Sequence, residues 1–314
     1  MISRLALLAL SGLLAMPLDG AAQENSRTPK VILIGIDGVR PDVLRSVPTP
    51  NLDSLIRTGA YSDRAQTGLP TISGPGWASM LTGVWKEKHG ILSNDFPFPD
   101  NGLDRYPDFL TRIERTRPQL RTFAVADWPP LIEPQTSEER GTAGPVLGQA
   151  IDARVSYDGG RLGWGAADEL SVAAAEAELL NNDPDAMFVY LGNPDEVSHH
   201  TGSIEDEYMA AIARADRQVG RLVAAIRARP NYEQEDWLIL VSTDHGRTTD
   251  GGHGGDTPEE RTIFFLANGP RIRPGSIDTP PNIVDVAATA LAYLGIGPDP
   301  TWGLDGRPVA NLER

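Results

Sequence analysis

The sequence predicts an α/β fold built on a mostly parallel sheet. Short and nearly continuous apolar runs, typical of strands buried on both faces, alternate along the chain with stretches of helical periodicity. This alternation is the pattern of βαβ units, whose helices cover both faces of a parallel sheet. The 314 residues, 40% hydrophobic and 23% charged, have the composition of a globular chain that can bury a large core.

The elements follow from local patterns taken in order. Strands are predicted where apolar runs of four to eight residues occur, at 30–37, 121–126, 187–191, 236–243 and 262–267. Helices are predicted where apolar residues recur every three to four positions, at 51–58, 76–82, 164–182, 203–229 and 283–294. The stretch 128–163 is rich in Pro and Gly and predicts a long loop or a small cap.

The N-terminus has the features of an export signal. Arg4 precedes an apolar run at 5–16, and small residues at 20–22 form a cleavage site, so 1–22 is predicted to be a signal peptide and 23–29 a linker. An uncleaved anchor is the rival interpretation, but a membrane span needs roughly 20 apolar residues. We therefore expect an exported protein, periplasmic or secreted, with no stable membrane anchor.

Charge and cysteine content narrow the partners. The net charge is −15 and there is no Cys, so the chain has no disulfide framework. An acidic surface repels a polyanion, which argues against extended DNA or RNA as a partner. A small phosphoester remains open, because a bound cation reverses the local field.

Metal-seeking residues come directly after three of the predicted strands. Asp37 ends the first, Asp244 and His245 follow the strand at 236–243, and Asp195 and His199 follow the strand at 187–191. A spacing of four puts Asp195 and His199 on one face of a helical turn. Since ligand groups gather at the carboxyl ends of parallel strands, these residues predict a metal site. Taken singly, each carboxylate is equally typical of a turn or a helix cap.

Two further residues complete the donor set. His253 lies between glycines in a loop that buries little, and Ser73 lies just before the helix predicted at 76–82. Free N–H groups at a helix start favour a phosphate oxygen. Three carboxylates, three imidazoles and one hydroxyl are enough for two zinc ions, which can clamp both oxygens of a phosphoryl transfer.

The order of these blocks resembles that of a known superfamily. The chain contains ILIGIDGVR, PTISGPGWASMLTGVWKEKHGILSND, YLGNPDEVSHHTG, LILVSTDHG and GGHGG in succession. It resembles the alkaline phosphatase superfamily, and most closely its type I phosphodiesterase/nucleotide pyrophosphatase branch. The resemblance implies an alkaline-phosphatase-like three-layer sandwich over residues 30–314 and a hydrolase that acts on phosphoric ester bonds.

The resemblance also implies roles for individual residues. One zinc ion would be held by Asp195, His199 and His253, and the other by Asp37, Ser73, Asp244 and His245. Ser73 would be the nucleophile and form a covalent phospho-enzyme intermediate. Asn94 matches the position of an asparagine that hydrogen-bonds a phosphoryl oxygen. Mn²⁺ can occupy the same oxygen and imidazole ligands.

The nucleophile segment departs from that branch. Where the branch usually has Thr-Phe-Pro-Asn-His, this chain has Ser73, Gly74, Pro75, Gly76 and Trp77. We expect the missing Phe to leave a more open mouth and Trp77 to offer a stacking surface, so nucleotide specificity is open. The segment also approaches the sulfatase signature, with Trp77 in place of its Arg. Sulfatases use calcium, which does not favour imidazole ligands.

A phosphate monoesterase and a non-catalytic binding module are also compatible with parts of the sequence. A monoesterase would need a cation for the extra phosphate charge, and Arg247, Lys86 or Lys88 could supply it, although each is typical of a surface charge. A non-catalytic module that binds metal or phosphoester would be expected to lack ligands, whereas every position is filled. The phosphodiesterase interpretation is favoured mainly by Asn94.

Overall fold

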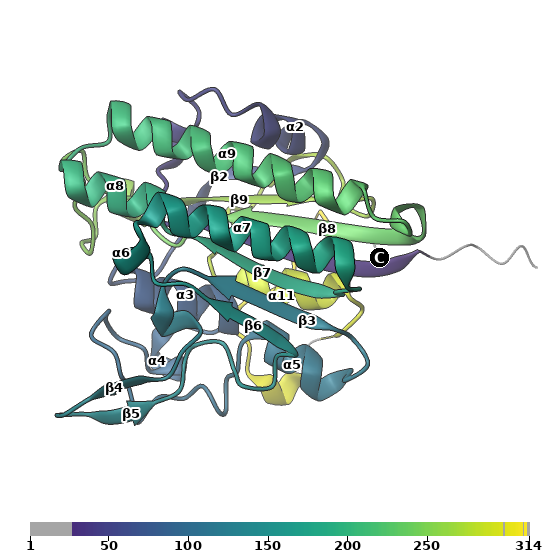
Figure 1. Ribbon diagram of the computed structural model, residues 1–314, viewed down its shortest axis with the longest axis horizontal. Helices are drawn as coiled ribbons and strands as arrows, with labels where there is room; N and C mark the ends of the chain where they lie inside the picture. Colours follow the sequence, from purple (N-terminus) through teal and green to yellow (C-terminus); the bar gives the residue numbers. More distant parts are fainter. Residues whose placement is uncertain (1–26, 298, 310, 313–314) are drawn as a thin grey trace, which may run out of the picture.

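A single twisted sheet organises the molecule (Figure 1). The computed structural model describes residues 27–297, 299–309 and 311–312, so the expected signal peptide at 1–22 lies outside the described residues. The eight-stranded sheet has the order β10-β2-β9-β8-β1-β7-β3-β6. Its strands are β1 (Thr28–Ile36), β2 (Ala60–Gln66), β3 (Thr122–Ala126), β6 (Ala153–Ser156), β7 (Ala186–Leu191), β8 (Glu235–Ser242), β9 (Thr262–Asn268) and β10 (Gly275–Ser276).

The sheet is mostly parallel, as the sequence predicts. Strands β8, β1, β7, β3 and β6 pair in parallel, and β9 runs antiparallel to both β8 and β2. The centre of the sheet is buried on both faces, which explains why its strands read as continuous apolar runs rather than as alternating ones.

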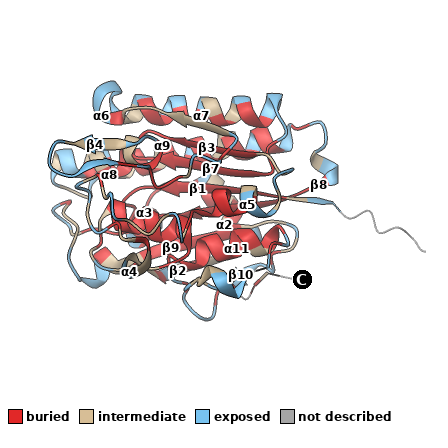
Figure 2. Cartoon of the chain, turned by 90° about the horizontal axis from the view of Figure 1, so that it is seen from below, coloured by how far each residue is buried: buried red, intermediate tan, exposed pale blue. Residues whose placement is uncertain are grey.

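Helices cover both faces and make three layers (Figures 1 and 2). One layer contains α1 (Pro41–Leu44), α2 (Pro50–Thr58), α7 (Trp164–Asn181), α8 (Asn193–Thr201) and α9 (Asp206–Arg227). The other contains α3 (Ser73–Thr82), α4 (Lys86–His89), α5 (Phe109–Thr116) and α11 (Asp285–Tyr293). Along β1, Val31 and Leu33 belong to the core under α3 and α11, and Ile32 and Ile34 to the core under α9. This alternation follows from the two-residue period of a strand.

The stretch 128–163 contains several short elements. They are the 3₁₀ turn η1 (Pro129–Leu131), a hairpin of β4 (Gln135–Ser137) and β5 (Gly141–Ala143), the edge strand β6, and α6 (Gly159–Leu162). Further short elements are η2 (Tyr232–Gln234), α10 (Pro258–Arg261) and η3 (Pro300–Trp302). The polar sequence AYSDRAQ of β2 carries no strand signal, and this segment is held extended by pairing with β9.

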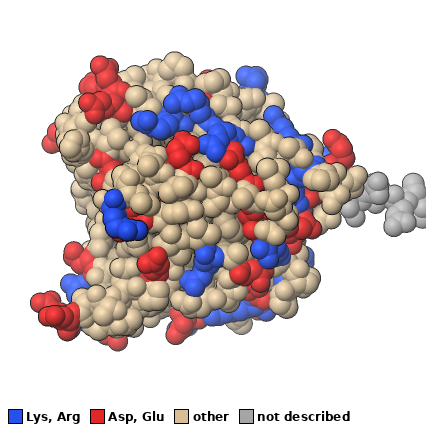
Figure 3. Space-filling model, viewed as in Figure 1, with Lys and Arg blue, Asp and Glu red and all other residues tan. Residues whose placement is uncertain are grey.

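Acidic and basic side chains are interspersed on the face that carries α7 and α9 (Figure 3). Arg221 of α9, for example, bonds Glu169 and Glu176 of α7. Among the residues that the structure describes, no helix combines the length and the apolar composition that a bilayer crossing requires.

The carboxyl ends of the parallel strands meet at one edge of the sheet. Asp37 follows β1, Asp127 follows β3, α8 begins just after β7, and Asp244 lies two residues beyond β8. Groups that are far apart in the chain therefore converge here, as is general for parallel α/β sheets.

Two buried carboxyl groups at this edge form an acid pair. Asp127 is fully buried and neither of its oxygens has a hydrogen-bond partner within the described structure, whereas Asp168 accepts hydrogen bonds from the N–H groups of Gly192 and Asn193. Burial is the main cause that raises the pKa of Asp127 well above its usual range, and the charge of Asp168 is the second cause. Burial raises the pKa of Asp168 to about 7. The pair therefore takes up protons when the chain folds.

We predict that Asp127→Asn raises the melting temperature more at pH 8 than at pH 5. Below the ordinary carboxyl pKa, near 4, both states are protonated and the pair costs nothing. The free energy of unfolding then falls as the pH rises toward the raised folded pKa values, and the amide removes this loss. Thermal unfolding at both pH values measures it, with the exposed Asp100→Asn as the control for a lost charge. An equal shift at both pH values would contradict the prediction.

Candidate active site

The first cluster at the carboxyl edge consists of Asp37, Asp244 and His245. One donor atom from each lies within 4.8 Å of the others. The Nε2 of His245 lies 3.5 Å from Asp37 Oδ1 and 3.4 Å from Asp244 Oδ2. All three side chains are buried. β8 ends at Ser242, and the irregular chain beyond it lets the adjacent Asp244 and His245 face the same point.

The protonation of His245 can be read from its other nitrogen. His245 Nδ1 lies 2.9 Å from the carbonyl oxygen of Gly246, which can only accept, so Nδ1 carries the proton. The bare Nε2 then faces two carboxylate oxygens, Asp37 Oδ1 and Asp244 Oδ2, which are buried without a hydrogen-bond partner in the described structure. Three acceptor atoms that face one another in a buried space fit a cation, because buried charges must be paired or coordinate a metal.

The second cluster consists of Asp195, His199 and His253. Asp195 Oδ2 lies 3.1 Å from His199 Nε2, its spacing partner on α8, and Asp195 Oδ1 lies 3.7 Å from His253 Nε2. The two imidazoles approach to 2.8 Å between their Nε2 atoms. His253 Nδ1 donates to the carbonyl of Thr71 at 2.8 Å, so its Nε2 is again bare. The cluster therefore also presents unprotonated donor atoms.

His245 joins the two clusters. It also lies within 4.8 Å of Asp195 and His253 when one ligand atom of each is taken, and its ring stacks on that of His253 with centroids 3.9 Å apart. The donor set of carboxylate oxygens and imidazole nitrogens suits zinc or manganese. The structure thus brings the six expected carboxylate and imidazole residues into one continuous patch.

Ser73 stands beside this patch at the start of α3. It is the first residue of the helix, one turn earlier than the predicted start at 76, and it is 6% exposed. Its Oγ lies 3.4 Å from His245 Nε2. The amide oxygen of Asn94 accepts a 2.7 Å hydrogen bond from the N–H of Gly74, so Asn94 lies next to the serine. Ser73 and Asn94 are therefore adjacent in space to each other, and Ser73 is adjacent to the first cluster.

Of the two expectations about the nucleophile segment, the stacking role of Trp77 is wrong and the more open mouth stays a prediction. A Cβ at Gly74 would collide with the carbonyl oxygen of Ser93, so backbone lies where a side chain at this position would begin. Trp77 offers no stacking surface at the mouth, because it is fully buried between Phe188 and Tyr190. The helical period of α3 turns position 77 toward the sheet and away from the site.

Trp77 instead fixes Asp37. Its Nε1 donates to Asp37 Oδ2 at 2.9 Å, and the hydroxyl of Tyr190 donates to the same oxygen at 2.6 Å. With Oδ2 saturated, Oδ1 is left to face His245. Outer partners of this kind orient a ligand and tune its basicity.

Arg247 also differs from its expected placement. It is completely buried rather than a surface charge, and its Nη2 forms an ion pair with Asp195 Oδ1. Its Nε donates to the carbonyl of Gly38 at 3.0 Å. Gly38 has a positive φ of 63°, and a Cβ there would collide with both Asp195 and the Arg247 guanidinium. The turn after β1 therefore requires glycine at position 38.

Burial shifts the pKa values of the groups at the site. Burial, and then Asp37, raises the pKa of Asp244 well above its usual range. Burial lowers the pKa of His245, and burial followed by His245 lowers the pKa of His253 to about 2. Both imidazoles are therefore neutral at physiological pH, the state in which a histidine binds a metal.

The comparisons with known proteins identify a family. Residues 31–251 match the model of the family described as type I phosphodiesterase / nucleotide pyrophosphatase. The chain belongs to this family. The resemblance found in the sequence is thereby confirmed.

Curated relatives cover the same region. Human ectonucleotide pyrophosphatase/phosphodiesterase family member 7 is 26% identical over 269 residues, which are 80% of this chain and 55% of the relative. Bis(5'-adenosyl)-triphosphatase enpp4 of Xenopus laevis is 37% identical over 237 residues, 72% of this chain and 49% of the relative. The chain thus spans about half the length of these relatives.

Solved structures confirm the fold. Murine ectonucleotide pyrophosphatase/phosphodiesterase 5 superposes with a TM-score of 0.65 at 16% identity, covering 85% of this chain and 95% of that one. A 2-O GAG sulfatase, BT1596, gives a TM-score of 0.65 at 13% identity, covering 91% and 76%. At these identities the likeness shows the shared three-layer architecture alone.

Sequence reasoning missed Tyr190 and the buried role of Arg247. Tyr190 is the penultimate residue of the strand predicted at 187–191, two residues before the GNPDE block, and its hydroxyl group in an apolar run was the available signal. His89, a histidine outside both clusters, is fully buried, with its Nε2 3.0 Å from Ser79 Oγ.

We predict that Trp77→Phe and Tyr190→Phe each weaken zinc binding roughly 10- to 100-fold, the usual cost of losing an outer partner. Each change removes one donor to Asp37 Oδ2 and leaves an aromatic ring in place, a phenyl instead of an indole at position 77. Competition of zinc against a chromophoric chelator measures the affinity. Trp302→Phe, distant from Asp37, is the matched control for a lost indole. Unchanged affinity in both site variants would show that Asp37 needs neither donor.

Proposed function

We propose that the protein is a metal-dependent phosphodiesterase of the nucleotide pyrophosphatase type, with Ser73 as its nucleophile. The observation that carries this proposal is the position of Ser73 Oγ, 3.4 Å from a bare, buried His245 nitrogen that also faces Asp37 and Asp244. A serine hydroxyl is a poor nucleophile in water and needs such a setting to react.

The residues that would hold two zinc ions are those implied by the family resemblance. Asp37, Asp244, His245 and Ser73 would hold one ion, and Asp195, His199 and His253 the other. When bound, the ions supply Lewis acidity and positive charge for the phosphoryl oxygens. The orphaned buried oxygens of Asp37 and Asp244 support the fit.

The chain's own groups position the reaction. Ser73 on the first turn of α3 loses its hydroxyl proton to solvent and attacks phosphorus. The bond from phosphorus to the leaving oxygen breaks, and the leaving group departs and takes up a proton from solvent. Water then attacks the covalent phosphoseryl enzyme, the bond from Ser73 Oγ to phosphorus breaks, and Oγ regains a proton. The start of α3 favours negative charge through its peptide dipoles. The amide oxygen of Asn94 accepts a hydrogen bond from the N–H of Gly74, so the amide N–H groups of Asn94 remain available for a phosphoryl oxygen.

Three cationic side chains that could have bound the second negative charge of a phosphate monoester have other partners or line another cavity. Arg247 is paired with Asp195, Lys88 bonds Asp305 and the carbonyl of Gly303, and Lys86 lines a separate cavity. A monoester dianion would therefore meet no free side-chain cation among these three. This supports a diester preference over a monoesterase activity.

The substrate class proposed is a small nucleotide-like phosphoester. The relatives include proteins named bis(5'-adenosyl)-triphosphatase, and an inactive variant of murine ectonucleotide pyrophosphatase/phosphodiesterase 5 has been solved in complex with AMP. The acidic chain argues against extended nucleic acid. Export, to the periplasm or beyond, rests on the signal-like segment at 1–22.

We predict that Ser73→Ala retains zinc but loses at least roughly 10³-fold in kcat, the scale found when a nucleophile is removed. Ser73→Thr is the matched control, because it keeps the hydroxyl and restores the residue usual in the family, and it should retain measurable turnover. Zinc content by metal analysis accompanies the rates. Turnover of Ser73→Ala equal to the wild type would remove Ser73 from the mechanism.

We predict that zinc-loaded protein hydrolyses bis-p-nitrophenyl phosphate with a higher kcat/KM than p-nitrophenyl phosphate. Asn94→Ala should lower kcat/KM for the diester by roughly 10-fold or more, the scale of one lost hydrogen bond to a charged oxygen. Asn94→Asp tests the amide donor, since it keeps the acceptor for Gly74. A preference for the monoester would favour a monoesterase activity instead.

A further inference from the structure

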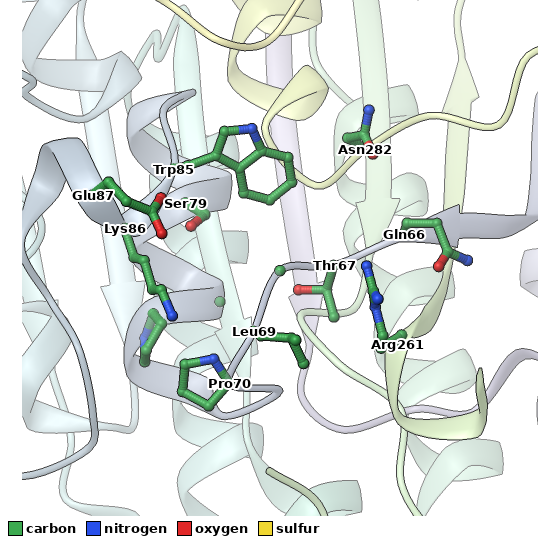
Figure 4. A pocket seen from close by; sticks show the side chains of 13 residues that line it. Gln66, Thr67, Leu69, Pro70, Ser79, Trp85, Lys86, Glu87, Arg261 and Asn282 are labelled. Atoms are coloured by element: carbon green, nitrogen blue, oxygen red, sulfur yellow. The ribbon is translucent and has the colours of Figure 1, made fainter. Parts of the chain in front are cut away.

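A cavity whose lining includes none of the metal-cluster residues borders α3, and Figure 4 shows it from close by. It has a volume of about 260 Å³ and opens between the loop after β2, the start of α4 and the end of α10. None of the residues of the two metal clusters lines it. Gly76 of α3 forms part of its wall, and a Cβ at Gly76 would lie 3.1 Å from the Cβ of Asp244. The cavity and the catalytic patch are therefore neighbours separated by α3.

The cavity has unsatisfied positive groups. Lys86 forms no ion pair within the described part of the chain, and Figure 4 shows its side chain extending toward Pro70 while Arg261 stands on the opposite side. Arg261 bonds Asp256 through Nη1, but its Nε is buried without a hydrogen-bond partner among the described residues. Buried donors are normally satisfied, so an orphaned one indicates a missing acceptor.

The charge of the cavity runs against that of the chain. The whole sequence carries −15, yet the wall of this cavity combines Lys86 and Arg261 with the single acid Glu87, which is exposed, and Asp256 outside the wall pairs with one nitrogen of Arg261. Lys86 is left without an ion-pair partner among the described residues, and such a cation attracts a small anion. The cations of the wall therefore indicate that one part of the ligand is an anionic group.

The remaining wall is apolar and contains an aromatic ring. Trp85 forms the roof in Figure 4, and Leu69, Pro70 and Pro75 contribute apolar surface. Leu69 is one of the exposed large hydrophobic residues of the protein. Trp85 is partly buried, and an indole at a cavity wall offers a face on which a flat ring can pack. Small-molecule sites commonly combine such apolar walls with a few polar groups.

We propose that this cavity binds a small organic anion, with a carboxylate or phosphate held by Lys86 and the Nε of Arg261 and a flat ring packed on Trp85. The site is distinct from the metal clusters and does not depend on the proposed hydrolase activity. Its occupant would touch the helix that begins at Ser73.

Binding of four probes to the full protein tests this proposal. The probes are benzoate, phenylphosphonate, the neutral benzyl alcohol and inorganic phosphate, each titrated by calorimetry. Benzoate or phenylphosphonate should bind roughly tenfold or more tightly than benzyl alcohol, the scale of a charge-assisted hydrogen bond. Inorganic phosphate should bind more weakly than phenylphosphonate at this site, because it lacks the ring. Tighter binding of benzoate than of phenylphosphonate assigns the site to carboxylates, and the reverse order to phosphates.

Variants locate the binding. Lys86→Met and Trp85→Leu should each weaken the better probe roughly five- to tenfold, and Lys86→Arg should retain it within about twofold. Lys88→Met is the matched control, since it removes the same charge two residues away from a lysine that bonds Asp305 and does not line the cavity. Thermal unfolding confirms that each variant is folded. Equal affinity in wild type and Lys86→Met, or benzyl alcohol binding as tightly as the anions, would overturn the proposal.

Discussion

The rest of the structure depends on one constraint, the convergence of buried carboxyl oxygens and imidazole nitrogens at the carboxyl edge of the sheet. Asp37 Oδ1, Asp244 Oδ2 and His245 Nε2 face one another in a buried space, and neither carboxyl oxygen has a hydrogen-bond partner among the described residues. Such an arrangement is unfavourable without a cation, because like partial charges are brought together in a low-dielectric space. It is retained because the surrounding groups, Trp77, Tyr190 and the Gly246 carbonyl, saturate the opposite side of Asp37 and of His245.

The parallel sheet brings these donor atoms together through short turns. Adjacent parallel strands β7, β1 and β8 end together, so three ligand-bearing turns open on one side. Arg247 and the glycine at position 38 then join the turns after β1 and β8 to Asp195 on α8. A buried ion pair of this kind holds Asp195 in one orientation, at the expense of desolvating both charges.

The distribution of cations separates the two sides of α3. On the side of the metal-seeking clusters, the guanidinium of Arg247 is paired with Asp195 and backbone carbonyls, so in the proposed function it is not available to a phosphoryl group. On the far side, Lys86 and part of Arg261 have no partner within the described residues. The same helix therefore borders a metal-seeking patch on one face and an anion-seeking cavity on the other.

The sequence by itself determined the α/β class, most strands and long helices, and the residues that gather at the site, because buried parallel strands and their terminal ligands leave strong local patterns. It did not determine β2 or the β4–β5 hairpin, whose polar residues are held extended by pairing partners distant in the chain or across a turn. Only the tertiary structure decided that Trp77 supports Asp37, that Arg247 is buried, and that His245 joins both clusters. Such roles depend on the direction in which a side chain points after packing. The spacing of residues within one segment does not predict which residues of another segment pack against it.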